Sequence, residues 1–201
     1  MNQKSLAIIT ARGGSKRIPR KNIKDFCGKP IMAYSIEAAL EAGCFDTVMV
    51  STDDEEIAQI AKKYGAEVPF LRSERTAGDF ATTADVLMEV FEEYEKRGEK
   101  FDHAACIYPT APFVTAQKLK AGMSLLQEKQ GTMLMPIVAF SFPPQRGVVK
   151  KGEFLEFCYP QYRNSRSQDL ETMYHDCGQF YCYCLLYTSP SPRDKRQYRM
   201  P

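Results

Sequence analysis

The sequence lacks several features that would assign it to a class of protein at once. No apolar run approaches the ~20 residues that a membrane-spanning helix needs. The N-terminus enters a short strand-like run without the longer apolar core and small-residue cleavage site of a signal peptide. The net charge of +2 is too small for a dedicated nucleic-acid binder. We therefore expect a cytoplasmic protein that binds neither a membrane nor nucleic acid.

Familiar catalytic and phosphate-binding motifs are missing as well. A Walker loop would need a glycine where Ile23 stands, five residues before the pair Gly28-Lys29. No G-x-G-x-x-G follows the first apolar run, and no spacing suggests a Ser-His-Asp or Cys-His arrangement. The seven cysteines are scattered and odd in number, so that without an export signal a disulfide framework is not expected.

Apolar runs alternate with helical patterns along most of the chain. We predict strands at 6–10, 47–51, 67–71, 104–108, 132–140 and 179–183. We predict helices at 30–43, 54–64, 83–97 and 115–128, with Thr52 and Asp53 capping the second and Thr115 the fourth. Strands separated by helices of about ten residues or more predict an α/β fold, with a mostly parallel Rossmann-like sheet covered on both faces.

Four polar features follow predicted strands. They are the loop that begins at Arg12, the tripeptide Ser51-Thr52-Asp53, the region of Arg72, and the tripeptide Tyr108-Pro109-Thr110. Ligands of such sheets sit at the carboxyl ends of the strands. The alternation therefore predicts that these sequence-distant groups meet at one rim.

The stretch 6–22, LAIITARGGSKRIPRKN, is the most informative of the four. Its glycines let backbone amides approach a ligand closely, and its five cations repel one another unless an anion lies among them. A loop of this kind straight after a strand is typical of a polyphosphate cradle. A solvated basic loop and a nucleic-acid patch are the alternatives that spacing leaves open.

The pattern changes from about residue 141. Prolines, aromatic residues and two short β-type runs around Gly152 predict a β-rich excursion that contains a hairpin. Such an arm often mediates dimer contacts, and a subdomain lid is the alternative interpretation.

Two motifs carry a family resemblance. The segment IITARGGSKRIPRKNIKDFCGKPIMAYSIEAAL resembles the signature A-R-x-x-S-K-R-I-x-x-K-N-I of the sugar-acid cytidylyltransferases, the acylneuraminate family. The segment RSQDLETMYHDCGQFY is similar to the run in family members that act on pseudaminic acid. The resemblance covers about residues 5–183. It implies the nucleotide-diphospho-sugar transferase fold with a dimerisation arm at about 141–176, a homodimer, and transfer of CMP from CTP to a nine-carbon nonulosonic acid with release of pyrophosphate.

The resemblance also implies roles for single residues. The catalytic residues would be Arg12, Lys16 and Lys21. The nucleotide-binding residues would be Ala11, Arg12, Gly13, Gly14, Ser15, Lys16, Arg17, Lys21, Asn22, Arg72, Thr82 and Thr83, and the sugar-binding residues Tyr108, Thr110, Arg166, Gln168 and Asp169. In the expected reaction the sugar hydroxyl attacks the α-phosphate, so positioning and charge neutralisation carry the catalysis.

Each of these residue types also has a purely structural interpretation. Arg72 could be a surface partner of a helix dipole, Arg166 could form an interface salt bridge, and Asp169 could orient Arg166. Tyr108 could pack in the core, and His175 could be a structural hydrogen-bonding residue. For Asp53 we favour helix capping over metal binding.

The C-terminus departs from the family pattern. Attack on a triphosphate normally needs Mg²⁺, and several relatives hold it through a D-x-D-like acidic stretch that this chain lacks. Residues 184–194, CLLYTSPSPRD, match the translation of a transposase-type sequencing adapter. We expect a cytidylyltransferase domain at 1–183 that is truncated before its metal ligands, an adapter-derived, disordered segment at 184–201, and little activity of the chain as it stands. A natural Ser/Pro-rich tail is the alternative.

Other functions of the same fold remain open. The substrate could be another sialic-acid-like or ulosonic acid, or a sugar phosphate. A non-enzymatic nucleotide-binding module is the alternative outside catalysis.

Overall fold

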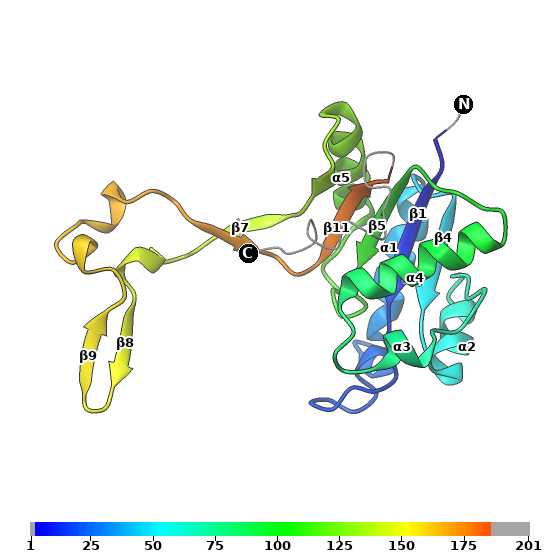
Figure 1. The fold of residues 1–201 in the computed structure, drawn as a ribbon, viewed down its shortest axis with the longest axis horizontal. Coiled ribbons are helices and arrows are strands. Elements are labelled where there is room, and N and C mark those ends of the chain that lie inside the picture. The colour runs from blue at the N-terminus through cyan, green and yellow to red at the C-terminus, as the bar shows by residue number, and fades with distance from the viewer. Residues whose placement is uncertain (1–2, 186–201) are drawn as a thin grey trace. The chain divides into compact units, whose positions relative to one another are not determined.

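The structure is a computed structural model that describes residues 3–185 (Figure 1). The chain divides into two compact units. The core unit is formed by 3–135 and 178–185 of the described residues, and the second unit is Pro136–Cys177. Of the predicted adapter-derived segment 184–201, the part after Leu185 lies outside the described residues.

The core unit is built on a five-stranded sheet among the described residues. Its order is β4 (Thr47–Ser51), β1 (Ser5–Thr10), β5 (His103–Ile107), β11 (Phe180–Cys184) and β6 (Met133–Leu134). Strand β1 pairs in parallel with β4 and β5, which confirms the α/β prediction for the centre of the sheet. Strand β11 is antiparallel to both of its neighbours, because no crossover helix leads the chain into it.

Alternation along β1 explains the layers on each side of the sheet. Leu6 and Ile8 face one hydrophobic cluster with α4 (Thr83–Lys96), whereas Ala7 and Ile9 face another. This second cluster contains residues of α1 (Ile31–Ala42), α2 (Glu55–Lys63) and α5 (Ala116–Glu128). All four β1 side chains are fully buried, and each large one contributes about 1.5–3 kcal/mol. Figure 1 shows α4 lying across one face, and both faces are covered as predicted.

Polar caps begin three of these helices. Thr115 caps α5 as predicted, and Thr82 forms a capping box with Asp85 at the start of α4. The predicted caps of α2, Thr52 and Asp53, are wrong, because the extended residue that precedes the helix is Asp54. Its carboxylate accepts a hydrogen bond from the Ile57 amide at 3.0 Å.

Two predicted strands are wrong in part or in whole, and a proline interrupts each. Residues 67–71 form only an isolated bridge between Glu67 and Met49, because Pro69 cannot donate to a ladder. The predicted strand 132–140 is divided at Pro136 into β6 in the core unit and β7 (Ile137–Ala139) in the second unit.

Short elements complete the core unit. They are the 3-10 turn η1 (Lys21–Ile23), the strands β2 (Asp25–Phe26) and β3 (Lys29–Pro30), and the helix α3 (Glu74–Ala77). Among the described residues, no helix is both long and apolar enough to cross a bilayer.

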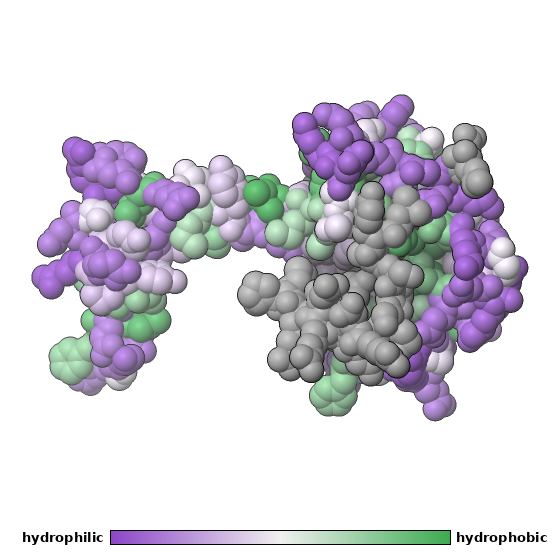
Figure 2. All heavy atoms as spheres, turned by 45° about the horizontal axis from the view of Figure 1, so that its top comes forward, coloured by the Kyte–Doolittle hydropathy of each residue, from purple (hydrophilic) through white to green (hydrophobic). Residues whose placement is uncertain are grey.

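The second unit is β-rich, as its composition predicted. Strands β8 (Val148–Lys151) and β9 (Phe154–Phe157) form the predicted hairpin, and β7 pairs with β10 (Tyr174–Asp176). The 3-10 turns are η2 (Pro144–Arg146), η3 (Pro160–Tyr162) and η4 (Ser167–Asp169). Figure 2 shows apolar spheres open to view among the hydrophilic ones of this unit. Phe154 and Leu155 are 77% and 68% exposed, so the hairpin carries apolar surface that the unit itself does not cover.

Candidate functional site

A cavity of about 790 Å³ lies in the core unit at the carboxyl ends of β1 and β5. Parallel strands end at the same edge of a sheet, so the loops that follow them supply its walls. The lining residues are Thr10, Arg12, Ser15, Lys16, Arg17, Ile18, Lys21, Asn22, Arg72, Thr76, Gly78, Asp79, Ala81, Thr82, Thr83, Val86, Tyr108, Pro109 and Thr110.

Most of the predicted site residues of the core unit lie in this lining. The exceptions are Ala11, Gly13 and Gly14. Ala11 is fully buried, and its amide donates to the carbonyl of Ser51 at 2.9 Å. The structure therefore brings the predicted cations together with Arg72 and the tripeptide after β5, while their ligand-binding roles stay predictions.

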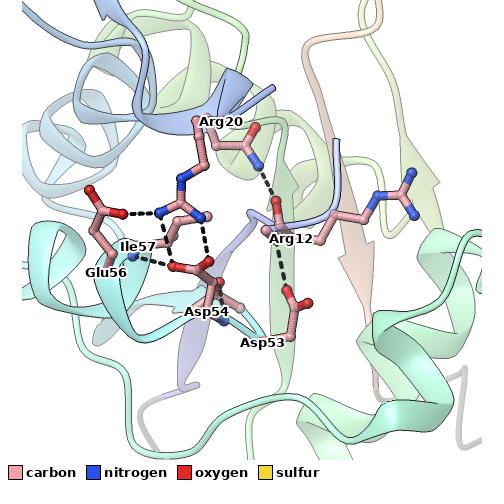
Figure 3. Close-up of polar contacts among 9 residues, drawn as sticks. Arg12, Arg20, Asp53, Asp54, Glu56 and Ile57 are labelled. Carbon is pink, nitrogen blue, oxygen red and sulfur yellow. Dashed lines mark hydrogen bonds and ion pairs between the residues drawn. The ribbon is translucent and has the colours of Figure 1, made fainter. Parts of the chain in front are cut away.

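The loop after β1 is held by side chains rather than by regular structure. The Gly13 amide donates to Oδ1 of Asp53 at 2.8 Å, and Nδ2 of Asn22 donates to the Arg12 carbonyl at 2.8 Å. Figure 3 shows that the Arg12 guanidinium points away from Asp53, whereas the backbone at Arg12 and Gly13 lies between these two contacts. Asp53 thus fixes the cation-bearing loop, and the capping role favoured for it is wrong.

Two backbone amides of the predicted phosphate cradle already have acceptors within the protein. Gly13 donates to Asp53, and Ser15 donates to the Gly13 carbonyl at 2.9 Å. These two amides are therefore not free to bind a phosphate in this arrangement, whereas the residues Arg12, Lys16, Arg17 and Lys21 line the cavity.

Arg20 is drawn away from the cavity by two carboxylates. Its guanidinium forms ion pairs with Asp54 and Glu56, as Figure 3 shows. The hydrogen bond from Arg20 holds the pKa of the Asp54 carboxyl below its usual range, and the hydrogen bond from Ile57 acts in the same direction. Arg20 has a φ of 55°, which is uncommon without glycine, so this pairing stabilises an otherwise unfavourable backbone.

Asp54 also explains the glycine at position 13. A Cβ atom on Gly13 would lie 2.8 Å from Oδ2 and 3.0 Å from Cβ of Asp54. Only glycine lets the loop approach the beginning of α2 this closely.

Two of the cavity cations share one carboxylate. Nη1 of Arg12 lies 2.9 Å from Oδ1 of Asp79, and Nζ of Lys16 forms an ion pair with Oδ2. Lys16 and then Arg12 hold the pKa of the Asp79 carboxyl below its usual range. Asp79 therefore remains ionised near neutral pH.

Arg72 is half-buried and held against the end of β4. Its Nε donates to Oγ of Ser51 and its Nη2 donates to the Ser51 carbonyl, both at 2.8 Å. Burial lowers the pKa of the guanidinium to about 10, against the opposing attraction of Asp53 and Glu89. The interpretation of Arg72 as a surface partner of a helix dipole is therefore wrong.

A buried carboxylate supports the wall beside Arg72. Glu89 is only 8% exposed, accepts a hydrogen bond from the Ser73 amide at 2.9 Å and accepts another from the Thr76 hydroxyl. Burial alone would raise the pKa of Glu89, but these two hydrogen bonds outweigh it and lower the pKa. The contacts join α3 to α4 and so fix one end of the segment 78–81.

The remaining predicted residues of the core unit have mixed surroundings. Tyr108 lines the cavity and also packs on both core clusters, with its ring centroid 5.6 Å from that of Tyr181. Thr82, Thr83 and Thr110 line the cavity, and the Thr82 hydroxyl also serves the capping box of α4.

The predicted sugar-binding residues from the second motif belong to the second unit. Arg166 pairs with Asp169 through two contacts, at 2.7 and 3.2 Å, in η4, where Gln168 also lies. Nδ1 of His175 lies 2.9 Å from the Asp176 carbonyl oxygen, which fits its interpretation as a structural hydrogen-bonding residue. Its ring also packs on Phe140, with centroids 4.8 Å apart.

Sequence reasoning missed several lining residues. They are Thr10, Ile18, Thr76, Gly78, Asp79, Ala81, Val86 and Pro109. Four of the eight lie at 76–81, in a polar stretch without periodicity that gave little signal, and Val86 lies in the predicted helix 83–97. Within residues 3–185, no group of three or more His, Cys, Asp or Glu side chains is placed to hold a metal ion.

Comparisons with known proteins show the family to which the chain belongs. The family model described as cytidylyltransferase matches residues 6–179. A pseudaminic acid cytidylyltransferase of Campylobacter jejuni is 44% identical over 180 residues, which cover 89% of this chain and 77% of the relative. A CMP-N,N'-diacetyllegionaminic acid synthase of Legionella pneumophila is 33% identical over a region that covers 75% of this chain and 66% of that relative.

A solved structure shows the same fold. A CMP:2-keto-3-deoxy-manno-octonic acid synthetase complexed with CTP superposes with a TM-score of 0.67 over 90% of this chain and 74% of the other, at 21% identity. The sequence relatives and the family model together cover nearly all of the core unit and the second unit. The chain belongs to the cytidylyltransferase family.

Proposed function

We propose that this protein transfers CMP from CTP to pseudaminic acid in the cytoplasm and releases pyrophosphate. The observation that supports it most is the cavity at the ends of β1 and β5, which gathers several cations around a space of about 790 Å³. A triphosphate carries enough negative charge to stabilise such a group of cations. The 44% identity to a pseudaminic acid cytidylyltransferase favours the sugar.

The proposed reaction is a displacement at phosphorus. The anomeric hydroxyl oxygen of the sugar forms a bond to the α-phosphorus, the bond from this phosphorus to the bridging oxygen of the β-phosphate breaks, and the hydroxyl proton passes to solvent or a base. Negative charge grows on the leaving pyrophosphate. Cations placed in advance around that charge stabilise the transition state.

We assign the charge-stabilising role to Arg12, Lys16 and Lys21, which line one wall. Asn22 is buried, and its Oδ1 has no hydrogen-bond partner within the described residues, which leaves it able to accept from a nucleotide. Arg72 is held rigidly by Ser51 and would meet the base or ribose. The sugar would lie near Tyr108 and Thr110 in the core unit. Arg166, Gln168 and Asp169, which belong to the second unit, stay predicted sugar contacts on the family resemblance alone.

The expected Mg²⁺ has no protein site of its own among residues 3–185, where no suitable cluster of ligands occurs. Mg²⁺ is usually held by one or two carboxylates together with the phosphates of the nucleotide, so we expect it to enter with CTP. We further propose a homodimer, because the second unit exposes apolar side chains such as Phe154 and Leu155 that an equivalent surface could cover.

The proposal is tested by pyrophosphate release from CTP, Mg²⁺ and pseudaminic acid. The assay is run on this chain and on a version whose residues from 184 onward are replaced by the corresponding segment of the Campylobacter jejuni relative. We expect sugar-dependent release by the second version. Absence of release, together with absence of CTP binding by both, would reject the proposal.

A second sugar is supported by the legionaminic acid relative at 33% identity. Rates on pseudaminic, N,N'-diacetyllegionaminic and N-acetylneuraminic acid, measured at the same CTP concentration, decide between them. We expect the highest kcat/KM with pseudaminic acid.

A further inference from the structure

The cavity contains one feature that triphosphate binding does not require. Among the described lining residues, five are cations, namely Arg12, Lys16, Arg17, Lys21 and Arg72, and one is a carboxylate, Asp79. A carboxylate in a polyphosphate site repels the ligand for which the cations are suited. Its presence therefore needs a reason of its own.

Asp79 contacts the cations much as a phosphate group would. Its Oδ1 accepts from Nη1 of Arg12 at 2.9 Å, and its Oδ2 forms an ion pair with Lys16, so each oxygen serves one cation. Nη1 of Arg12 also donates to the Gly78 carbonyl at 3.3 Å. These contacts hold the segment 78–81 against the loop that follows β1.

The surroundings let this segment move without disturbing its neighbours. Glu89 fixes the chain before it through Ser73 and Thr76, and the capping box of Thr82 fixes the chain after it. Between them, Phe80 is fully exposed, so its large side chain gives no burial that would oppose a displacement. Moving Asp79 off the two cations costs only the exposed ion pairs, which are individually weak.

We propose that Asp79 is an intramolecular competitor of phosphate for Arg12 and Lys16. This inference rests on the proposed function, in which the β- and γ-phosphates of CTP bind these cations. In the free protein the carboxylate occupies them, and an incoming polyphosphate displaces it. When pyrophosphate has formed, the carboxylate competes for the same cations and weakens the binding of that product.

The competition limits affinity for every anion that needs these two cations. Orthophosphate exchanges its contacts with Arg12 and Lys16 for those of the carboxylate and gains little. A triphosphate also reaches Arg17, Lys21 or Arg72, so it retains net affinity. Asp79 thus sets the threshold of charge and length that a ligand must exceed.

The test compares Asp79→Asn with Glu74→Gln. Both variants lose one negative charge in the same region, but Glu74 is exposed and lies outside the cavity lining. The probes are inorganic pyrophosphate and tripolyphosphate, titrated by calorimetry at a fixed ionic strength. We expect Asp79→Asn to bind both roughly two- to tenfold more tightly than Glu74→Gln does, from the loss of two exposed ion pairs. Asp79→Glu, which restores the charge with a longer reach, should return the affinity towards that of the unmodified protein.

Equal affinities for Asp79→Asn and Glu74→Gln, or weaker binding by Asp79→Asn, would overturn the inference. Failure of any of the proteins to bind pyrophosphate would overturn it too, because the cations would then not form a phosphate site. The proposed function fails separately: a protein that binds tripolyphosphate with the expected order of variants but does not bind CTP supports the competitor and rejects the cytidylyltransferase.

Discussion

Replacing Gly13 with alanine tests how the loop after β1 is positioned. The new Cβ would lie 2.8 Å from Oδ2 and 3.0 Å from Cβ of Asp54. Oδ2 accepts from Arg20 and Oδ1 accepts from the Ile57 amide, so the carboxylate could rotate away only by giving up these contacts. The Cβ atom of Asp54 is fixed to the backbone that begins α2. Gly14 is the matched control, because apart from chain neighbours no described heavy atom lies within 4 Å of its added Cβ.

The expected cost follows from three contributions. Overpacking of this kind typically costs about 1–3 kcal/mol. A disturbed helix cap costs about 1 kcal/mol. Removing a glycine recovers about 0.4–1 kcal/mol through the unfolded chain. We therefore expect Gly13→Ala to lower the free energy of unfolding by roughly 1–3 kcal/mol. Gly14→Ala has the same gain through the unfolded chain without a clash, so it should raise the free energy of unfolding by up to about 1 kcal/mol.

Urea unfolding of the two variants measures this difference. Adding Asp54→Ser to Gly13→Ala should recover part of the loss, because serine retains a capping oxygen and removes the carboxylate oxygen at 2.8 Å. Identical unfolding midpoints for Gly13→Ala and Gly14→Ala would refute the argument that close approach to Asp54 requires a glycine.

Three further predictions concern titration and buried polar groups. Burial raises the pKa of the Tyr94 phenol, whose oxygen has no hydrogen-bond partner among the described residues. Just above pH ~10 this phenol therefore ionises only in the unfolded chain, so the free energy of unfolding falls there. In Tyr94→Phe, urea unfolding at two pH values should show the free energy of unfolding without that part of the fall. Hydrogen bonds from Thr76 and Ser73 lower the pKa of Glu89 on folding, so its stabilisation is present above the unfolded pKa and is lost on acidification. Between pH 6 and 3.5 the midpoint temperature of thermal unfolding should therefore fall less steeply in Glu89→Gln than in the unmodified protein. In Arg72→Lys, the lysine cannot reproduce both hydrogen bonds to Ser51, so the free energy of unfolding measured in urea should fall by roughly 1–2 kcal/mol. An unchanged free energy of unfolding would contradict the conclusion that Ser51 holds Arg72.

Local patterns predicted the sheet centre well for a physical reason. The strands β1, β4 and β5 are buried on both faces and therefore read as short apolar runs. The predicted strand at 67–71 was wrong, although Pro69 was visible, because its β-type composition outweighed the missing backbone donor.

The sequence predicted the cations of the cavity but not the contacts of the carboxylates that hold them in place. Arg12, Lys16 and Lys21 follow a strand closely, so topology places them at its end. Asp53 and Asp79 act on that loop across sequence separations of 40 and 67 residues, and neither has a local pattern that shows this. Contacts of that kind depend on the tertiary fold, which the sequence pattern specifies only as an order of strands and helices.

The calorimetric titration of CTP into the protein, Arg12→Ala and Lys24→Ala tests the central claim most directly. Both variants lose one positive charge from the same stretch, but Lys24 is exposed and outside the cavity lining. We expect CTP to bind the unmodified protein. Arg12→Ala should weaken CTP binding by about 10- to 100-fold, as expected for a lost charge-assisted hydrogen bond, and Lys24→Ala should change it little. Equal CTP affinities of Arg12→Ala and the unmodified protein would contradict the assignment of this cavity to the triphosphate.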